Sequence, residues 1–298
     1  MQYEEFLEEI LQTARERFGD GYRFTPMDIP ANNGVIRHSL AISHGASGVS
    51  PCIRMDGFFR EHLSGCSMGR IAEEIRASYE NSAGERFDLP AFLSWERIQP
   101  KICCRLVNTG KNGAMLPGFP HREVLDLSIV YYVQVPMSGG AVGTVRVRNE
   151  HMGFWGIGEA ALYEVAMSNR ECSRETTIKS LDETLGEIFG QGWIKNCRDP
   201  HAPKMYVLGR RDFAYGAVGM LDKKALKKAA GIFGREFAIL PSSVHEVLLV
   251  PVTGAEGEME GYAKIVREVN DTQVLPEEVL SYHVYRYSEE TEELTIAA

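Results

Sequence analysis

Residues 236–251 constrain the fold most, because they contain two apolar runs joined by a short turn. The first run reads Glu-Phe-Ala-Ile-Leu, and a Pro-Ser-Ser turn leads into Val-His-Glu-Val-Leu-Leu-Val-Pro. Short apolar runs separated by a turn signal predict neighbouring strands at 236–240 and 244–250. Both faces of the second strand become apolar after Glu246, which indicates a strand that is covered on both sides.

The remaining segments predict an alternation of strands and helices. The order strand, strand, helix recurs at 35–80, 124–170 and 236–270. We therefore predict an α+β fold whose mixed or antiparallel sheets come from repeated ββα-like units, with helices packed on one face. The apolar run at 215–221 predicts a further strand. Apolar stripes at helical spacing predict helices at 2–18, 56–63, 66–80, 158–170, 222–233 and 257–270.

Glycine and proline positions predict the domain organisation. Residues 190–203 are rich in both and have few apolar side chains, which is typical of a linker. We predict an N-terminal α+β domain at 1–190 and a C-terminal α+β subdomain at 204–287 with its own sheet. The end of the chain, 288–298, is acidic, and we expect a mobile tail there.

The charge balance disfavours two classes of partner. The formal net charge of the 298 residues is −9, whereas nucleic acid and anionic membrane surfaces both attract positively charged proteins. No apolar run reaches the ~20 residues that span a bilayer. The lysines at 223, 224, 227 and 228 form a basic face on a predicted helix, and a solvated surface is the more ordinary interpretation of it. We therefore expect no membrane partner and disfavour nucleic acid.

The cysteines and the N-terminus predict a cytoplasmic location. The six cysteines are scattered, without a CxxC pair, and their spacing fits no disulfide framework, so we expect six free thiols. The first ten residues are acidic and amphipathic, unlike the basic and then apolar start of a secretory signal.

The polar residues of the 241–246 turn are the first candidate site. Ser242 and Ser243 precede His245 and Glu246, and a serine near a histidine suggests a nucleophile with its base. No G-x-S-x-G motif is present, and Glu246 is expected to point away from His245 on a strand. Capping and hydrogen bonding within the turn therefore stand beside catalysis as the structural interpretation.

The long connection at 108–123 is the second candidate, with Lys111, His121 and Arg122 as binding residues. Long loops with cationic and apolar side chains often serve recognition, although a merely packed loop is an equal alternative. No glycine-rich phosphate-binding motif and no His-Glu-x-x-His zinc motif is present. His38 and His44 are too few for a zinc site, so we predict neither a metal nor a cofactor.

Several stretches, spread over most of the chain, resemble those of an uncharacterised bacterial family, DUF5688. They are 32–35, 49–51, 119–122, 125–132, 205–208, 239–247 and 284–287. The stretch 149–169 is also distantly similar to a second uncharacterised family, DUF1444. The resemblance implies a cytoplasmic accessory protein, and one option is that it is encoded near mobile elements. It implies no catalytic residues, because none is established for the family.

These observations leave three alternative hypotheses for the function. The first is a cytoplasmic, non-catalytic binding or accessory protein, whose partner could be another protein. The second is a hydrolase or transferase that uses His245 with nearby Ser or Glu side chains. The third and weakest is a protein that contacts nucleic acid through the lysine face. Convergence of the turn residues on an open cleft would favour the second function.

Overall fold

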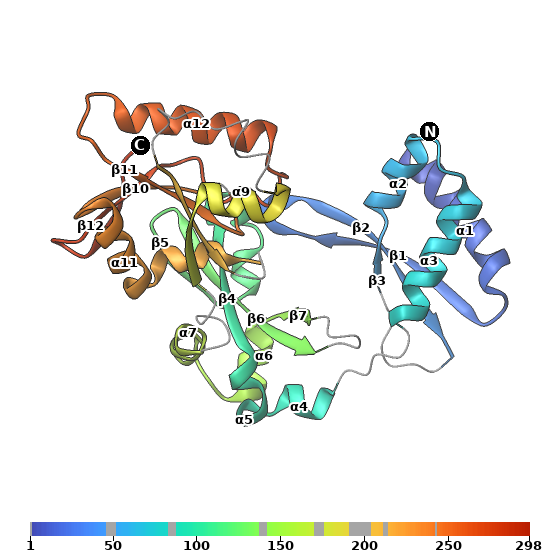
Figure 1. Ribbon diagram of the computed structural model, residues 1–298. Helices are drawn as coiled ribbons and strands as arrows, with labels where there is room; N and C mark the ends of the chain where they lie inside the picture. The colour runs from blue at the N-terminus through green and yellow to red at the C-terminus, as the bar shows by residue number, and fades with distance from the viewer. Residues whose placement is uncertain are drawn as a thin grey trace. The chain divides into compact units, whose positions relative to one another are not determined.

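The computed structural model describes residues 2–45, 52–82, 88–136, 142–169, 176–190, 204–210, 214–241 and 243–298. Over these residues the chain is an α+β protein with antiparallel sheets, as predicted (Figure 1). It divides into two compact units. Unit 1 comprises Met1–Ala31, Val35–Phe92 and Pro136–Gly143, and unit 2 comprises Asn32–Gly34, Leu93–Val135 and Thr144–Ala298. The predicted boundary at 190–204 falls within the span of unit 2, and 191–203 lie outside the described residues.

Unit 1 packs helices against a small antiparallel sheet. The sheet has the order β1 (Tyr22–Pro30), β2 (Ile36–His44), β3 (Cys52–Arg54). Its helices are α1 (Tyr3–Phe18), α2 (Asp56–Leu63) and α3 (Met68–Ser82), with α4 (Leu89–Leu93) at the end of this stretch of chain. The predicted apolar stripes of α1 and α3 are buried in one core, which includes Phe6, Ile10, Leu40, Ile42, Ile71 and Ile75.

The first sheet of unit 2 has the order β4 (Ile102–Asn108), β6 (Leu127–Pro136), β5 (His121–Val124), and β7 (Val142–Arg146) also pairs with β6. Helix α7 (Glu159–Ser168) contacts β4. At its end the Asn169 amide donates to the carbonyls of Gln99 and Ile102, at 3.0 and 2.9 Å. Two short helices, α5 (Trp95–Ile98) and α6 (Asn149–Trp155), complete this part of the chain.

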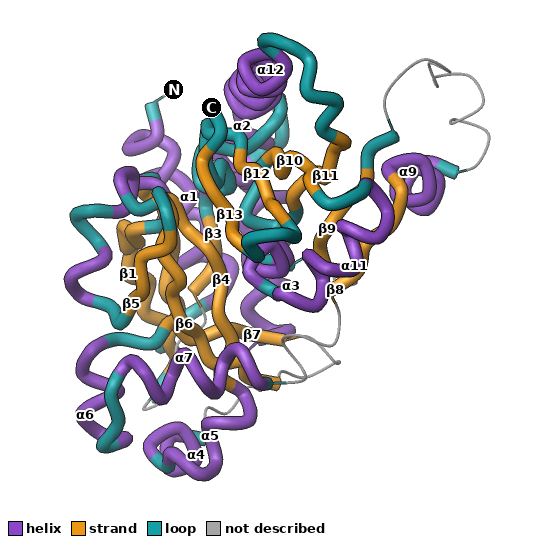
Figure 2. The backbone as a smooth tube through the Cα atoms, turned by 90° about the vertical axis from the view of Figure 1, so that its left-hand side faces the viewer, coloured by secondary structure: helices purple, strands orange, loops and turns teal. Residues whose placement is uncertain are grey.

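The second sheet of unit 2 contains the two apolar runs of residues 236–251. Its order is β13 (Glu293–Ile296), β12 (Tyr285–Ser288), β10 (Glu236–Leu240), β11 (Val247–Pro251), β9 (Tyr206–Arg210), β8 (Thr176–Ser180) (Figure 2). All neighbouring pairs are antiparallel. The strands predicted near 204–208, 236–240 and 244–250 therefore do share one sheet.

Helices cover both faces of this sheet, which corrects the expectation of helices on one face. On one face α12 (Glu258–Thr272) packs over Ala238, Leu240 and Val250. On the other, Phe233 of α11 (Lys223–Phe233) lies 5.6 Å from the ring of Phe237. Because residues 237 and 238 point to opposite sides of a strand, the two helices lie on opposite sides of β10. The third helix, α9 (Leu181–Phe189), follows β8 directly.

Two local expectations differ from the structure. Residues 215–221, predicted as a strand, instead form the 3₁₀ helix η6 (Gly216–Leu221), and Tyr215 before it has a left-handed φ of 54°, which does not fit a strand. Residues 288–298, expected as a mobile tail, contribute β13, which pairs with β12. The finer idea of repeated ββα-like units stays a prediction.

Asparagine side chains fasten two distant segments of unit 2 together. The short 3₁₀ turn η1 (Asn32–Gly34) supplies Asn32, which donates to the Glu277 carbonyl at 2.8 Å. Asn33 donates to the carbonyls of Pro276 and Val279 at 2.8 and 2.7 Å. These bonds satisfy backbone carbonyls in a stretch that has no regular secondary structure.

Candidate functional site

The turn between β10 and β11 is closed by hydrogen bonds of its own residues. The Ser243 hydroxyl accepts from the His245 N–H at 3.0 Å and donates to the Glu246 carboxylate at 2.9 Å. Val244 N–H donates to the Glu278 carbonyl at 2.8 Å. Because β11 begins at Val247, His245 and Glu246 lie in the turn and not on the predicted strand. Ser242 lies outside the described residues.

The imidazole ring of His245 has a contact at each nitrogen. Its Nδ1 accepts the backbone N–H of Tyr215 at 3.2 Å, and its Nε2 lies 3.4 Å from a Glu278 carboxylate oxygen. An Nδ1 that accepts a hydrogen bond carries no proton, so the proton of the neutral ring lies on Nε2 and faces Glu278. The ring also stacks on Tyr215, with 5.3 Å between the centroids.

Tyr215 connects this turn to the first sheet of unit 2. Arg105 of β4 places its guanidinium 4.6 Å from the centroid of the Tyr215 ring, a cation–π distance. The next residue, Gly216, packs so closely that an added Cβ would lie 2.4 Å from the backbone nitrogen of Arg210 and 2.7 Å from the carbonyl oxygen of His245. Glycine at 216 was the sequence signal for this close approach, and the strand prediction overlooked it.

The structure brings Ser243, His245 and Glu246 together, but with a different pairing from that of a nucleophile and its base. Ser243 is only 5% exposed, and its hydroxyl donates to Glu246 rather than to the imidazole. A serine nucleophile would instead donate to the histidine that removes its proton. The three residues are therefore arranged as a hydrogen-bonded turn.

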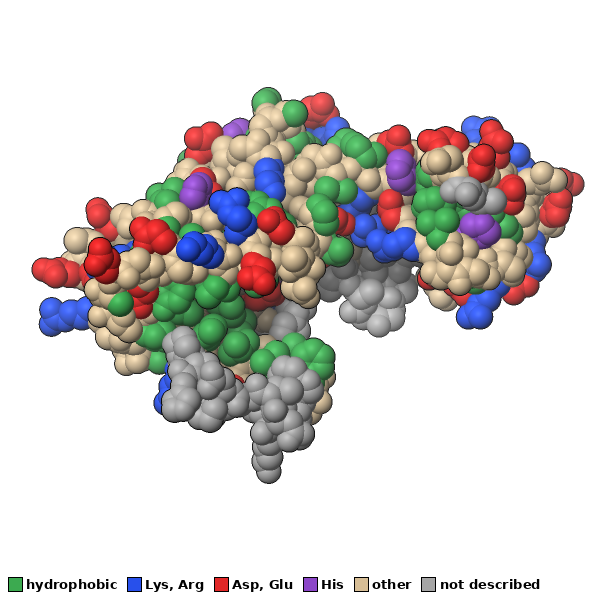
Figure 3. All heavy atoms as spheres, turned by 90° about the horizontal axis from the view of Figure 1, so that it is seen from above, with side chains coloured by type: hydrophobic (Ala, Val, Ile, Leu, Met, Phe, Trp, Pro, Cys, Tyr) green, Lys and Arg blue, Asp and Glu red, His purple; other side chains and the backbone are tan. Residues whose placement is uncertain are grey.

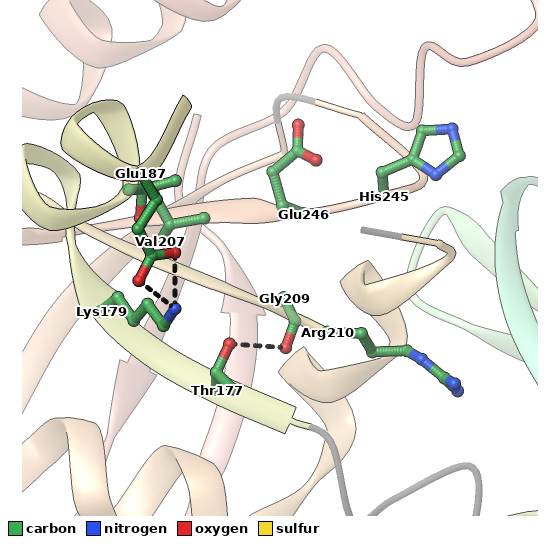
Figure 4. Close-up of a pocket in the computed structure, with 9 residues that line it drawn as sticks. Thr177, Lys179, Glu187, Val207, Gly209, Arg210, His245 and Glu246 are labelled. Atoms are coloured by element: carbon green, nitrogen blue, oxygen red, sulfur yellow. Dashed lines mark hydrogen bonds and ion pairs between the residues drawn. The ribbon is translucent and has the colours of Figure 1, made fainter. Parts of the chain in front are cut away.

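A cavity of about 370 Å³ lies beside this turn (Figure 4). Lys179 of β8 forms hydrogen bonds of 2.7 Å to both carboxylate oxygens of Glu187 on α9. Glu246 comes from the turn, and in the close-up the His245 ring points away from Lys179 and Glu187. The cavity therefore offers charged groups of both signs to a ligand. Its lining is Thr177, Lys179, Thr184, Glu187, Val207, Gly209, Arg210, His245 and Glu246.

None of the three candidates of the 108–123 connection lines this cavity, and each has a contact elsewhere. Lys111, in the 3₁₀ turn η3 (Gly110–Asn112), places its ammonium 4.7 Å from the Tyr282 ring centroid. His121 Nδ1 lies 2.9 Å from the Phe119 carbonyl. A second 3₁₀ turn, η4 (Leu116–Gly118), follows η3 in the connection.

Arg122 has the most extensive contacts of the three. Its guanidinium donates twice to the Glu159 carboxylate, at 3.2 and 2.8 Å, and lies 3.8 Å from the Tyr163 ring centroid. The Tyr131 hydroxyl donates to the same carboxylate. A bidentate pair of this kind joins β5 to α7, so the contacts of Arg122 are those of a fold-stabilising residue.

A cluster around Asp126 is a site that the sequence analysis missed. The carboxylate accepts hydrogen bonds from the Ser281 hydroxyl at 2.6 Å, the Tyr285 hydroxyl at 2.7 Å and His283 Nδ1 at 3.0 Å. Burial on its own would raise the pKa of Asp126, but these hydrogen bonds outweigh it and lower that pKa. The sequence places the three donors at every second residue, 281, 283 and 285, but this spacing does not indicate Asp126 as their partner.

The described residues include free thiols but no cluster of metal ligands. Within the described ranges no group of three or more His, Cys, Asp or Glu side chains could hold a metal ion. Cys52, Cys66 and Cys104 are free thiols, but Cys103 is disulfide-bonded, so the expectation of six free thiols is wrong and the cysteines no longer support a cytoplasmic location. Cys172 and Cys197 lie outside the described residues. None of the helices in the described part of the chain is long and apolar enough to cross a membrane.

The fold and these sites define an α+β protein with two compact units and a charged cavity beside a hydrogen-bonded turn. The chain belongs to a family of unknown function, DUF5688, which matches it over residues 3–289. The distant likeness to DUF1444 has no support from this match. Comparison with curated proteins and with solved structures finds no significant match.

Proposed function

We propose that this protein is a non-catalytic binding or accessory protein of the bacterial cytoplasm, with its ligand in the cavity beside the 243–246 turn. The observation that carries the proposal is the use of His245. Both ring nitrogens face groups of the protein itself, and the ring points away from Lys179 and Glu187 of the cavity. Catalysis by His245 would need one nitrogen aimed at a substrate.

The charged groups of the cavity fit a small polar ligand that carries both an acidic and a basic group. Lys179 and Glu187 already pair, and each could exchange part of that pairing for a ligand group of opposite charge. The binding of such a ligand needs no nucleophile, metal or cofactor. An accessory role near mobile elements is the setting that the family resemblance adds to this proposal.

The test is to incubate the purified protein with a mixture of small polar metabolites and to analyse the mixture by mass spectrometry. We expect one or more metabolites to be retained by the protein without the formation of new masses. The variants Lys179→Met and Glu187→Gln should lose this retention, whereas Lys111→Met, outside the cavity, should keep it. New masses that disappear with His245→Ala would overturn the proposal and establish the hydrolase or transferase alternative.

The lysine face of α11 gives little support to the weaker alternative, which is contact with nucleic acid. Lys227 lies 2.6 Å and Lys223 3.7 Å from the Glu292 carboxylate, so part of the face is already neutralised. On the surface shown in Figure 3, Lys and Arg side chains lie among Asp and Glu rather than in one patch. Binding to a phosphate backbone needs several unpaired cations on one surface.

A further inference from the structure

A second cavity of unit 2, of about 350 Å³, differs chemically from the one beside His245. It lies between α7 and β4 on one side and η6 with the start of α11 on the other. Most of its lining is apolar, and two lysines are the only cations among the described residues that line it. The lining is Cys104, Tyr163, Ala166, Met167, Thr176, Val218, Gly219, Leu221, Asp222, Lys223 and Lys224.

The inner part of this cavity contains neutral groups. The thiol of Cys104 lies 3.9 Å from the sulfur of Met167, and burial raises the pKa of this thiol to about 12. Cys104 is therefore protonated at neutral pH and behaves as a small apolar side chain. Ala166 is 2% exposed and adds another apolar surface. An alkyl chain placed here would lose contact with water without leaving a charge unpaired.

The charged groups at the start of α11 are not equivalent. Asp222 caps the helix, because its carboxylate accepts the backbone N–H groups of Lys224 at 2.8 Å and Ala225 at 3.4 Å. Lys223 lies 3.7 Å from Glu292. Lys224 is exposed, and its ammonium forms no hydrogen bond or ion pair with the described residues. Lys224 is thus available to an anionic group at the edge of the cavity.

We propose that this cavity binds a small amphipathic carboxylate, with its hydrocarbon tail against Cys104, Ala166 and Met167 and its carboxylate at Lys224. The site is separate from the polar cavity of the proposed function and takes a ligand of different chemistry. Apolar lining supplies the affinity for the tail, and the ammonium group selects an anionic head group. The basic face of α11 would then have a specific use.

The first experiment measures the binding of hexanoate, octanoate and decanoate by isothermal titration calorimetry, below their micelle concentrations. Each added methylene group should tighten binding by about twofold to fourfold until the cavity is full, because a longer tail buries more apolar area. Affinity that is independent of chain length, or the absence of binding by all three, would overturn the proposal.

The second experiment tests the head group. Lys224→Gln should weaken octanoate binding by about fivefold and leave the binding of 1-octanol unchanged, because only the carboxylate uses the ammonium group. Lys228→Gln is the matched control, since it removes the same charge one helical turn further along α11, outside the cavity lining. Equal losses in both variants would show a general charge effect and would contradict the assignment to Lys224.

A third variant tests the location of the tail. Val218→Phe adds a ring to a half-buried position of the lining and should abolish octanoate binding while the protein stays folded. Thermal unfolding of the variant checks the fold. Glu187→Gln, which belongs to the polar cavity, should leave octanoate binding intact, so failure of the proposed function and failure of this inference remain distinguishable.

Discussion

His245 is held at both ring nitrogens and on one ring face, and these contacts come from residues far from it in the chain. Tyr215 contributes a backbone donor and a stacked ring, and Glu278 contributes a carboxylate. A ring in such contacts loses hydrogen bonds and packing together when it is removed. We therefore expect the His245 ring to stabilise the folded protein.

The first prediction is that His245→Ala lowers the free energy of unfolding by about 1–3 kcal/mol, through an unpaired Tyr215 N–H and a cavity beside its ring. Urea unfolding of the variant and the parent measures this difference. His121→Ala, which removes a ring with a single local contact, is the control and should cost less. An unchanged unfolding midpoint in His245→Ala would contradict the structural role.

The second prediction concerns Asp126, whose carboxylate accepts three side-chain hydrogen bonds. Asp126→Asn should cost about 1–3 kcal/mol at pH 7, because an amide oxygen cannot replace both carboxylate oxygens as acceptors. The pKa of Asp126 in the folded protein is lower than the pKa of an aspartate in the unfolded chain, which is about 3.9. Its contribution is therefore complete well above pH ~4 and is lost as the pH falls through the lower, folded-state pKa.

Urea unfolding of the parent and Asp126→Asn between neutral and acidic pH checks this sign. The difference in stability between the two proteins should shrink as the pH falls below ~4. Glu256→Gln, at an exposed position, serves as the control. A difference that stays constant down to the most acidic pH would show that ionisation of Asp126 contributes nothing.

At the scale of elements, η6 is positioned by its close approach to β9. The backbone nitrogen of Arg210 and the carbonyl oxygen of His245 leave no room for a side chain at Gly216. We predict that Gly216→Ala costs about 1–3 kcal/mol, because the turn or the strand must move to admit the methyl group. Gly231→Ala is the matched control within α11, where nothing lies within 4 Å of an added Cβ.

The control should be neutral or more stable than the parent by up to about 1 kcal/mol, since alanine favours a helix interior over glycine. Thermal unfolding of both variants makes the comparison. Equal stability of Gly216→Ala and Gly231→Ala would mean that η6 tolerates displacement from β9.

The same elements show how far the sequence predicts this fold. The helices at 3–18, 56–63 and 68–82 lie within two residues of their predicted ranges, because an apolar stripe at helical spacing depends only on neighbouring residues. The strand predicted at 215–221 failed because an apolar run with glycines also suits a 3₁₀ turn against a sheet.

The candidate site was predicted less completely than the fold. His245, Ser243 and Glu246 were named from the sequence, and they do lie in contact. Their partners Tyr215 and Glu278 could not be named, because no local pattern joins residues some thirty positions apart. The Asp126 cluster was missed for the same reason, since its donors lie more than 150 residues away.

At the scale of the whole molecule, the disulfide at Cys103 alters the count of reactive thiols. A disulfide uses two cysteines, so we predict four free thiols in denatured, unreduced protein and six after reduction. Titration with a thiol reagent under both conditions measures them. Six thiols before reduction, in protein prepared without reductant, would show that the bond does not form in solution.

The net charge of −9 and the pairing of Lys223 and Lys227 with Glu292 lead to a prediction about partners. Fluorescence anisotropy with labelled duplex and single-stranded DNA and RNA should show no binding at physiological salt. Affinity that falls steeply with rising salt would contradict this expectation and revive the nucleic-acid alternative.

The asparagine bonds of η1 also bear on the order in which the protein folds during its synthesis. Asn32 and Asn33 are synthesised well before the residues whose carbonyls they bind, since 276–279 lie about 245 positions further along the chain. Contacts of such long sequence separation form late and slowly. The helices and sheet of unit 1 come mostly from residues 1–92 and can assemble while later residues are synthesised, whereas unit 2 needs segments that extend from residue 32 to residue 298.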